Sequence, residues 1–198
     1  MGACLDTKYF RLFLFAILSL SMASCAGALV DQKLYWKSTS DPKDFDIGSL
    51  SKHKFKIAPF QDERKMTPKN KIAENTEGEK IRVVTADTDD LSEYVTQNVT
   101  QVLDRSGLEL ATSGDAFVIT GVIKDLFVSE ASLYKGSATI KYVVKKGDQV
   151  VWSGVETGGS KRFGRSYKME NYMEAMSDAL VDSLLKFLRD PDFRRALK

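Results

Sequence analysis

The chain has 198 residues and a formal net charge of +2, with 28% charged and 43% hydrophobic residues. This composition excludes a disordered or fibrous protein. The near-neutral charge argues against a nucleic-acid partner, whose binding requires a concentrated basic surface. A chain of this length buries a core large enough to fold without a disulfide or a metal ion, so we expect a single domain that needs no cofactor.

The N-terminal segment has the order of a secretory signal peptide. Lys8 and Arg11 precede an uncharged stretch, residues 12–30, whose first half is strongly apolar and whose second half is rich in small residues. A positive end, an apolar segment and then small residues are typical of an exported protein. A transmembrane helix is the alternative, because about 20 apolar residues span a bilayer, but the run of Ser, Ala and Gly weakens it. We therefore predict that residues 1–24 are a signal peptide.

The end of this segment, Met22-Ala23-Ser24-Cys25, resembles the lipobox of bacterial lipoproteins. The resemblance implies that diacylglycerol is attached to Cys25, that the chain is cleaved between Ser24 and Cys25, and that the new amino group is acylated. Met22 departs from the Leu that is commoner at its place. The alternative is an unmodified Cys25 thiol. A disulfide with Cys4 is disfavoured, because Cys4 would leave with the signal peptide.

Lipid on Cys25 would place the mature protein at a membrane surface, since two or more acyl chains anchor a protein stably where one binds only marginally. Ala26 follows the anchor, and by resemblance to enteric lipoproteins it favours the outer membrane, facing the periplasm, over the inner membrane. We predict a lipidated tether over residues 25–52, which are rich in Ser, Asp, Lys and Gly, and one folded domain over residues 53–198.

The domain begins with two strands and a helix. Residues 55–60 and 81–84 are short apolar runs next to turn-forming or charged residues, which indicates strands. Asp89 or Asp90 can cap a helix that follows, and Gly107 ends it. The apolar positions of this helix share one side: Leu91, Val95, Val99, Val102 and Leu103.

In the second half of the domain, the sequence pattern predicts three longer strands and a helix. Residues 116–128, 132–145 and 149–160 are extended pieces, and the middle one alternates apolar and polar residues, as in a sheet with one wet face. Residues 171–188 have apolar side chains at helical spacing, and Asp190-Pro191 predicts a short terminal helix. The predicted fold class is an α+β two-layer sandwich with a mainly antiparallel sheet, ordered strand, helix, three-stranded meander and helix, with both long helices on one face.

No reaction centre is evident from the residue types. His53 is the only histidine, flanked by two lysines, and we expect it at the surface rather than in a catalytic or metal site. A pair of carboxylates could hydrolyse a glycoside, but the sequence does not place any two of them at a suitable separation. The carboxylates considered are Asp62, Glu63, Asp89, Asp90 and Asp125.

The only local basic cluster lies in a Gly-rich segment and comprises Lys161, Arg162, Arg165 and Lys168. A solvated loop is the favoured interpretation of this cluster, and a site for an anion or a lipid headgroup is the alternative.

The order of parts resembles the YajG-like family of bacterial lipoproteins. The residues that carry the likeness are the lipobox at Cys25, Asp62-Glu63-Arg64, "LDRSGLEL", "VITGVIKDLFVSEASLYKGSATIKYVV", the Trp152 strand and "ALVDSLLKFLRDPDFRRAL". The resemblance implies a small lipoprotein facing the periplasm, with no enzymatic residues to carry over. A broader likeness, at the level of the fold, links it to auxiliary lipoproteins of ABC-type transport systems.

These features together predict a lipid-anchored protein of the bacterial cell envelope that acts as a non-catalytic binding or accessory module. The partner would be an envelope protein at an edge strand, or a lipid or glycan at the open face of the sheet. The alternatives are an auxiliary lipoprotein of an ABC-type transport system and a carboxylate-dependent envelope hydrolase. No metal, cofactor or nucleic acid is predicted.

Overall fold

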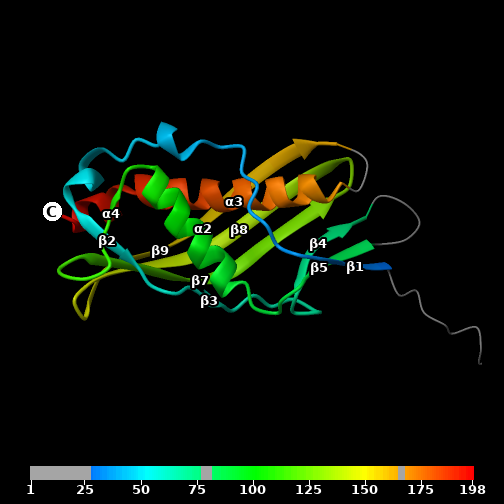
Figure 1. Cartoon of the computed structure of the whole chain (residues 1–198), viewed down its shortest axis with the longest axis horizontal. Coiled ribbons are helices and arrows are strands. Elements are labelled where there is room, and N and C mark those ends of the chain that lie inside the picture. The colour runs from blue at the N-terminus through cyan, green and yellow to red at the C-terminus, as the bar shows by residue number, and fades with distance from the viewer. Residues whose placement is uncertain (1–27, 77–81, 165–167) are drawn as a thin grey trace, which may run out of the picture.

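The computed structural model describes residues 28–76, 82–164 and 168–198, which form one large sheet covered on one face by helices (Figure 1). The strands are β1 (Ala28–Gln32), β2 (Lys54–Ile57), β3 (Gln61–Asp62), β4 (Lys71–Asn75), β5 (Arg82–Ala86), β6 (Glu109–Leu110), β7 (Phe117–Glu130), β8 (Leu133–Lys146) and β9 (Gln149–Phe163). The helices are α2 (Ser92–Arg105), α3 (Met169–Arg189) and α4 (Pro191–Ala196), with short 3₁₀ helices η1 (Pro42–Asp44) and η2 (Gly48–Lys52).

The predicted fold class, an α+β two-layer sandwich with a mainly antiparallel sheet, is wrong, because the nine strands form a mixed sheet. Strands β2, β3 and β4 follow one another along the same edge of β7, and all three are parallel to it. Strand β1 is parallel to β5. The three strands beside β7 have only two to five residues each, too few to show the alternation that identifies a strand in a sequence.

The predicted meander is confirmed as β7, β8 and β9, each antiparallel to the next. Strand β8 buries every second side chain, from Tyr134 to Val144, while its intervening residues are polar or partly exposed. This alternation is the expected consequence of a sheet with one face on the core and one face in solvent.

Helix α3 is the main cover of the sheet, and its predicted range is confirmed to within two residues at each end. It lies across β8 and β9 and reaches β7 (Figure 1). Two glycines permit its close approach: a Cβ atom on Gly136 would lie 2.2 Å from the carbonyl oxygen of Ala175, and one on Gly158 would lie 2.1 Å from that of Ala179. The helix backbone therefore rests directly on strand backbone at these two places.

The predicted cap Asp190 is confirmed at the start of α4, whereas the N-cap residue of α2 is Leu91, one residue after the predicted Asp90. The Asp90 carboxylate accepts a hydrogen bond from the Ser92 amide at the start of α2, and the Asp190 carboxylate accepts one from the Phe193 amide in α4. Phe193 then packs against Phe187 of α3, with ring centroids 4.4 Å apart. The short C-terminal helix is thus held on the core by an aromatic contact.

The predicted tether is packed against the domain over residues 28–52. Strand β1 joins the sheet beside β5, and Phe45 and Leu50 are buried in the core. The Asp178 carboxylate of α3 accepts hydrogen bonds from the Ser38 hydroxyl and from the amide and hydroxyl of Thr39. The chain is therefore fixed to the domain from its first described residues.

The glycine contact under α3 gives a matched pair of variants. We expect Gly158→Ala to lower the free energy of unfolding by about 1–3 kcal/mol or more, because the added methyl group cannot fit beneath the helix backbone. Gly159→Ala should change it by less than about 0.5 kcal/mol, since the atom nearest to a Cβ atom there is 3.8 Å away. Urea unfolding of both variants checks this, and equal stability of the two would contradict the packing described.

Candidate functional site

Asp62, one of the carboxylates considered for catalysis, is buried in an ion pair with Arg64. Arg64 donates through Nε and Nη2 to the Asp62 carboxylate, and the Leu91 amide donates to the same carboxylate at 3.0 Å. Burial by itself raises the pKa of Asp62, but these hydrogen bonds outweigh it and hold the pKa below its ordinary value. Arg64 also donates to the Lys71 carbonyl oxygen, so the pair joins β3, the loop after it and the start of α2.

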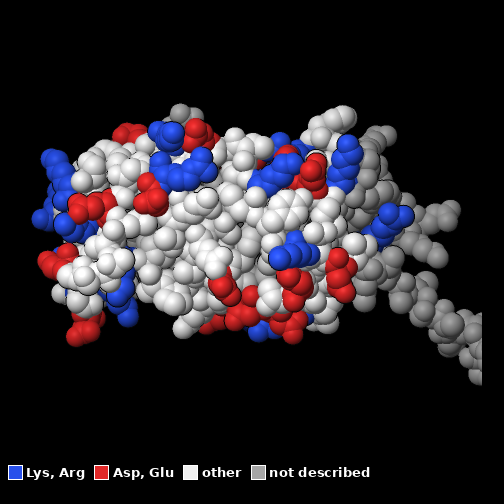
Figure 2. Space-filling model, in the orientation of Figure 1, with Lys and Arg blue, Asp and Glu red and all other residues white. Residues whose placement is uncertain are grey.

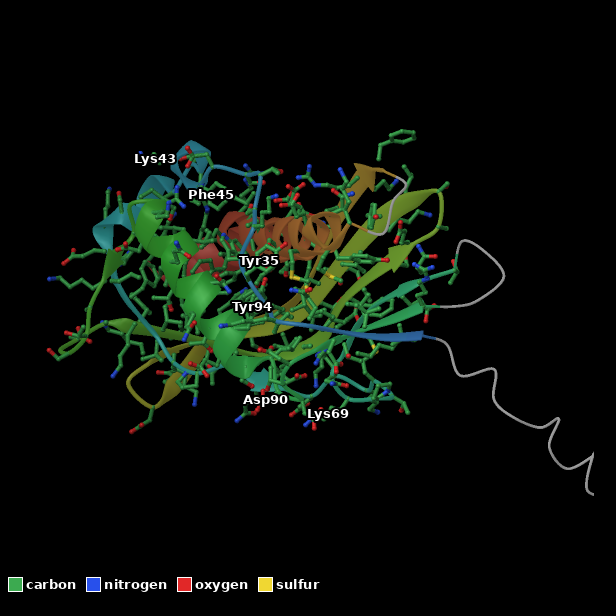
Figure 3. The ribbon with its side chains drawn as sticks, turned by 45° about the vertical axis from the view of Figure 1, so that its right-hand side comes forward. Tyr35, Lys43, Phe45, Lys69, Asp90 and Tyr94 are labelled. Carbon is green, nitrogen blue, oxygen red and sulfur yellow. The ribbon has the colours of Figure 1, made fainter. Side chains whose placement is uncertain are left out.

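The remaining carboxylates considered for catalysis mostly make contacts that serve the fold. Glu63 pairs with Lys124 at 2.5 Å, and Asp125 accepts a hydrogen bond from Ser137. Asp90 accepts a hydrogen bond from the Ser92 amide at the start of α2 and lies near Lys69 (Figure 3). Asp62 and Asp90 are close enough to interact electrostatically, but the side chain of Asp62 is only 1% exposed. This pair therefore does not present two accessible carboxylates to a substrate.

Removal of the Asp62 charge should destabilise the fold. We expect Asp62→Asn to lower the free energy of unfolding at pH 7 by about 3–5 kcal/mol, because it leaves Arg64 buried without its counter-ion. The depressed pKa also means that the unfolded state binds the proton first, so wild-type stability falls as the pH drops below about 4.

The Asp62→Asn protein should lose less stability than the wild type as the pH falls, because it lacks the carboxylate whose protonation destabilises the wild-type fold. Asp89→Asn is the control, because Asp89 is exposed. Denaturant unfolding between pH 3 and 7 measures both effects, and an Asp62→Asn protein as stable as the wild type would refute the role of the pair.

His53 and Glu130 are two further titratable residues, and both make contacts within the fold. His53 is half-buried rather than exposed as predicted, with its ring edge-on to Phe117 at 5.5 Å. Glu130 is buried at the end of β7 and accepts a hydrogen bond from the Tyr172 hydroxyl, whose pKa is raised by burial and by this carboxylate. No sequence pattern pointed to Glu130, because the predicted strand ends two residues before it. Within the described ranges no cluster of His, Cys, Asp or Glu could hold a metal ion.

The most distinctive surface is the side of β7, β8 and β9 that faces away from α3, which we call the open face. Its position follows from Gly136 and Gly158, which face the helix, so that the residues next to them in each strand point the other way. Val155, at 58% exposure, lies near its middle. The register places it beside Lys141 of β8, which in turn lies beside Val122 of β7. The open face thus combines apolar side chains with lysines.

The charge on the open face has one sign along β8 and β9. The outward positions of these two strands contain no Asp or Glu, and they contain four lysines, namely Lys135, Lys141, Lys145 and Lys161. On the face that carries the helices, by contrast, positive and negative side chains lie close together in mixed groups (Figure 2). Along β8 and β9 the open face is therefore cationic, while on β7 the same face carries Asp125, which is paired with Thr139.

A shallow depression of about 520 Å³ lies where the open face meets the edge of β9. Gly136 and Gly159 are among its lining residues and bring no side chains to it. Lys135, Lys161 and Lys186 line it, although Lys186 is already paired with Asp182 at 3.0 Å. Lys135 and Lys161 are neighbours in the register of β8 and β9, and both are exposed.

The basic cluster expected in a loop is divided by the structure. Lys161 and Arg162 belong to β9 and point to opposite faces. Arg162 faces α3, where it pairs with Asp178 at 2.6 Å and with Glu174 at 3.2 Å. Lys168 is exposed before α3, and Arg165 lies outside the described residues. Only Lys161 of the two strand residues is thus presented on the open face.

A second hollow, a polar groove of about 430 Å³, separates the N-terminal segment from α2. Ser38, Ser40, Gln101 and Arg105 are among its lining residues. The segment reaches it after Tyr35, which lies where the chain passes Tyr94 of α2 (Figure 3). The groove is open and lined mainly by side chains that hydrogen-bond readily to water. It therefore favours a particular ligand less than the open face does, where apolar side chains and lysines are combined.

The predicted lipid-attachment and cleavage residues, Cys25 and Ser24, lie outside the described residues. Strand β1 begins three residues after Cys25. Across the part of the chain that the structure describes, no helix has the length and apolar character needed to span a bilayer.

No protein-family model matches the chain, and no curated protein sequence matches it. A solved structure, protein XCC0632 from Xanthomonas campestris, of the family model DUF330, is similar with a TM-score of 0.53 and 13% identity, over 80% of this chain and 92% of that chain. At this identity the likeness shows a shared fold alone.

More distant similar structures include a minor lipoprotein from Acinetobacter baumannii, with a TM-score of 0.38 and 12% identity over 72% of this chain and 94% of that one. They also include lipoprotein GNA1162 from Neisseria meningitidis, with a TM-score of 0.33 and 9% identity over 60% of this chain and 90% of that one. The similar structures thus include bacterial lipoproteins, while the specific resemblance to the YajG-like family stays a prediction.

Proposed function

We propose that this chain is a lipid-anchored protein of the bacterial cell envelope that binds a partner protein through its open face, without catalysing a reaction. The observation that carries the proposal is the open face itself, which presents Val155 and Lys141 on a rigid sheet. Because its lysines face solvent without an acidic neighbour on β8 or β9, the complementary partner surface is acidic.

The sequence also suggested a partner at an edge strand, but the open face is a better docking surface than the edge of β9. The Gly159 amide of this edge donates to Asp182, and the Thr157 carbonyl oxygen accepts a hydrogen bond from Lys186. Side chains of α3 thus satisfy backbone groups that an added strand would need. Four of the five carboxylates considered for a hydrolase, all except Asp89, are engaged in structural contacts, which favours binding over catalysis.

The anchor is supported by the lipobox resemblance at Met22–Cys25 and by Ala26, which favours the outer membrane. We expect the wild-type protein to carry lipid and to sediment with membranes, and Cys25→Ser to lose both properties, because the serine hydroxyl does not replace the thiol in thioether formation. Metabolic labelling with a fatty acid, followed by membrane fractionation, measures this. Equal labelling of the two proteins would refute the anchor.

Docking on the open face is tested by site-specific crosslinking in intact cells. A photoreactive residue at Val155 should give a discrete adduct, whereas the same residue at Asp104, exposed on α2, should not. Lys141→Glu should reduce the Val155 adduct roughly tenfold, since replacing attraction by repulsion at such a site costs on the order of 1–2 kcal/mol.

The control for Lys141→Glu is Lys43→Glu, which makes the same charge change at an exposed position of η1, a segment that contacts α2 on the helical side of the sheet. An adduct at Asp104 but not at Val155 would move the interface to the helical side. An adduct at Val155 that is indifferent to Lys141→Glu would remove the electrostatic part of the proposal.

A further inference from the structure

A row of paired residues crosses the sheet at one end and relates its two outer strands. Ala28 of β1 is paired with Arg82, Arg82 with Asn75, and Asn75 with Glu130. The row continues from Glu130 to Tyr134 in β8 and from Tyr134 to Arg162 in β9. Since neighbouring strands lie about 4.8 Å apart, the five steps span about 24 Å. The beginning of β1 and the end of β9 therefore lie at the same end of the sheet, on the right in Figure 1.

The anchor would hold this end at the membrane. Only two residues separate Cys25 from Ala28, and the three residue steps between them reach at most about 11 Å in an extended chain. Strand β1 cannot move away from the domain without losing its pairing with β5. A lipid on Cys25 would therefore keep the row within a short distance of the headgroups, with the strands running away from them.

The side chains at this end suit contact with a lipid surface. Phe163, one residue beyond the row, is 87% exposed, the most exposed large apolar side chain among the described residues. Lys161 and Lys135, on the same side of the sheet as Phe163, line the depression beside it. The acidic Glu170 at the start of α3 is paired with Lys37. An aromatic ring flanked by lysines is typical of segments that lie in the interfacial layer of an anionic membrane.

We infer that this end of the sheet forms a second membrane contact, in which Phe163 enters the interfacial layer and Lys135 and Lys161 bind anionic phospholipid headgroups. The inference rests on the proposed function, because it requires lipid on Cys25. The covalent anchor makes the contact intramolecular, so that a small surface suffices: the headgroups are present at high effective concentration. The contact would orient the domain, with the rest of the open face, beyond Lys135 and Lys161, standing away from the bilayer.

The test uses the full-length chain, lipidated in a bacterial host and reconstituted in vesicles. Phe163→Cys and Val155→Cys provide single sites for a polarity-sensitive fluorophore, because Cys4 leaves with the signal peptide and Cys25 is acylated. Both positions are exposed on the same face, and eight residues of strand, about 26 Å, separate them. In vesicles of phosphatidylethanolamine and phosphatidylglycerol we expect the probe at 163 to shift to shorter wavelength and to be quenched by brominated lipid. The probe at 155 should show neither effect.

The role of the two lysines is tested by a pair of Lys→Gln substitutions in the protein labelled at position 163, with a second pair of Lys→Gln substitutions far from the proposed contact as the control. Lys135→Gln with Lys161→Gln should abolish the dependence of the shift at 163 on phosphatidylglycerol. Lys52→Gln with Lys56→Gln makes the same charge change at exposed positions near the opposite end of the sheet and should leave the dependence intact. An equal shift in vesicles of phosphatidylcholine alone would overturn the role of anionic headgroups.

The mass of the protein is measured first, to show whether Cys25 carries lipid. This measurement separates the proposed anchor from the proposed second membrane contact. Absence of lipid on Cys25 overturns the anchor and this inference with it. Lipid on Cys25 with a water-exposed probe at 163 overturns this inference alone. Quenching of both probes would also overturn it, because the whole open face would then lie flat on the bilayer.

Discussion

The direct contact between the backbone of α3 and the backbones of β8 and β9 is the constraint on which the rest of the structure depends. It requires Gly136 and Gly158, since any Cβ atom there would overlap a helix carbonyl group. The contact decides which face of the sheet is buried, and so which face remains open. It also brings Asp182 and Lys186 to the edge of β9, which protects this long edge strand from further pairing.

The same helix fixes the N-terminal segment, and with it the place of the anchor. Burial raises the pKa of Asp178, but hydrogen bonds from Thr39, Ser38 and Arg162 hold it below its ordinary value, so the carboxylate stays charged as it binds them. One residue of α3 therefore joins the N-terminal segment to β9. Because β1 is also paired in the sheet, a lipid on Cys25 would orient the domain rather than merely retain it near the membrane.

The long elements of this fold could be predicted from the sequence, because each carries its own periodic signal. Strand β8 alternates over 14 residues, and α3 repeats apolar positions over several turns. The parallel strands β2, β3 and β4 could not, since each is too short to show a period and forms only by pairing with β7. The ion pair of Asp62 with Arg64 was hidden for a similar reason: a charged turn in a sequence does not reveal that tertiary contacts bury it.

The open face and the end of the sheet differ in what the sequence could say about them. The alternation in β8 predicts one wet face, and Lys141 belongs to it, but only the register places Val155 beside Lys141. Phe163 lies beyond the predicted end of its strand, and its exposure has meaning only because the row from Ala28 to Arg162 crosses six strands. Strands of 14 residues extend about 46 Å, so a domain held at that row would present most of the open face well above the headgroups. A partner protein could then approach this face from the side, while the lysines nearest the row bind lipid.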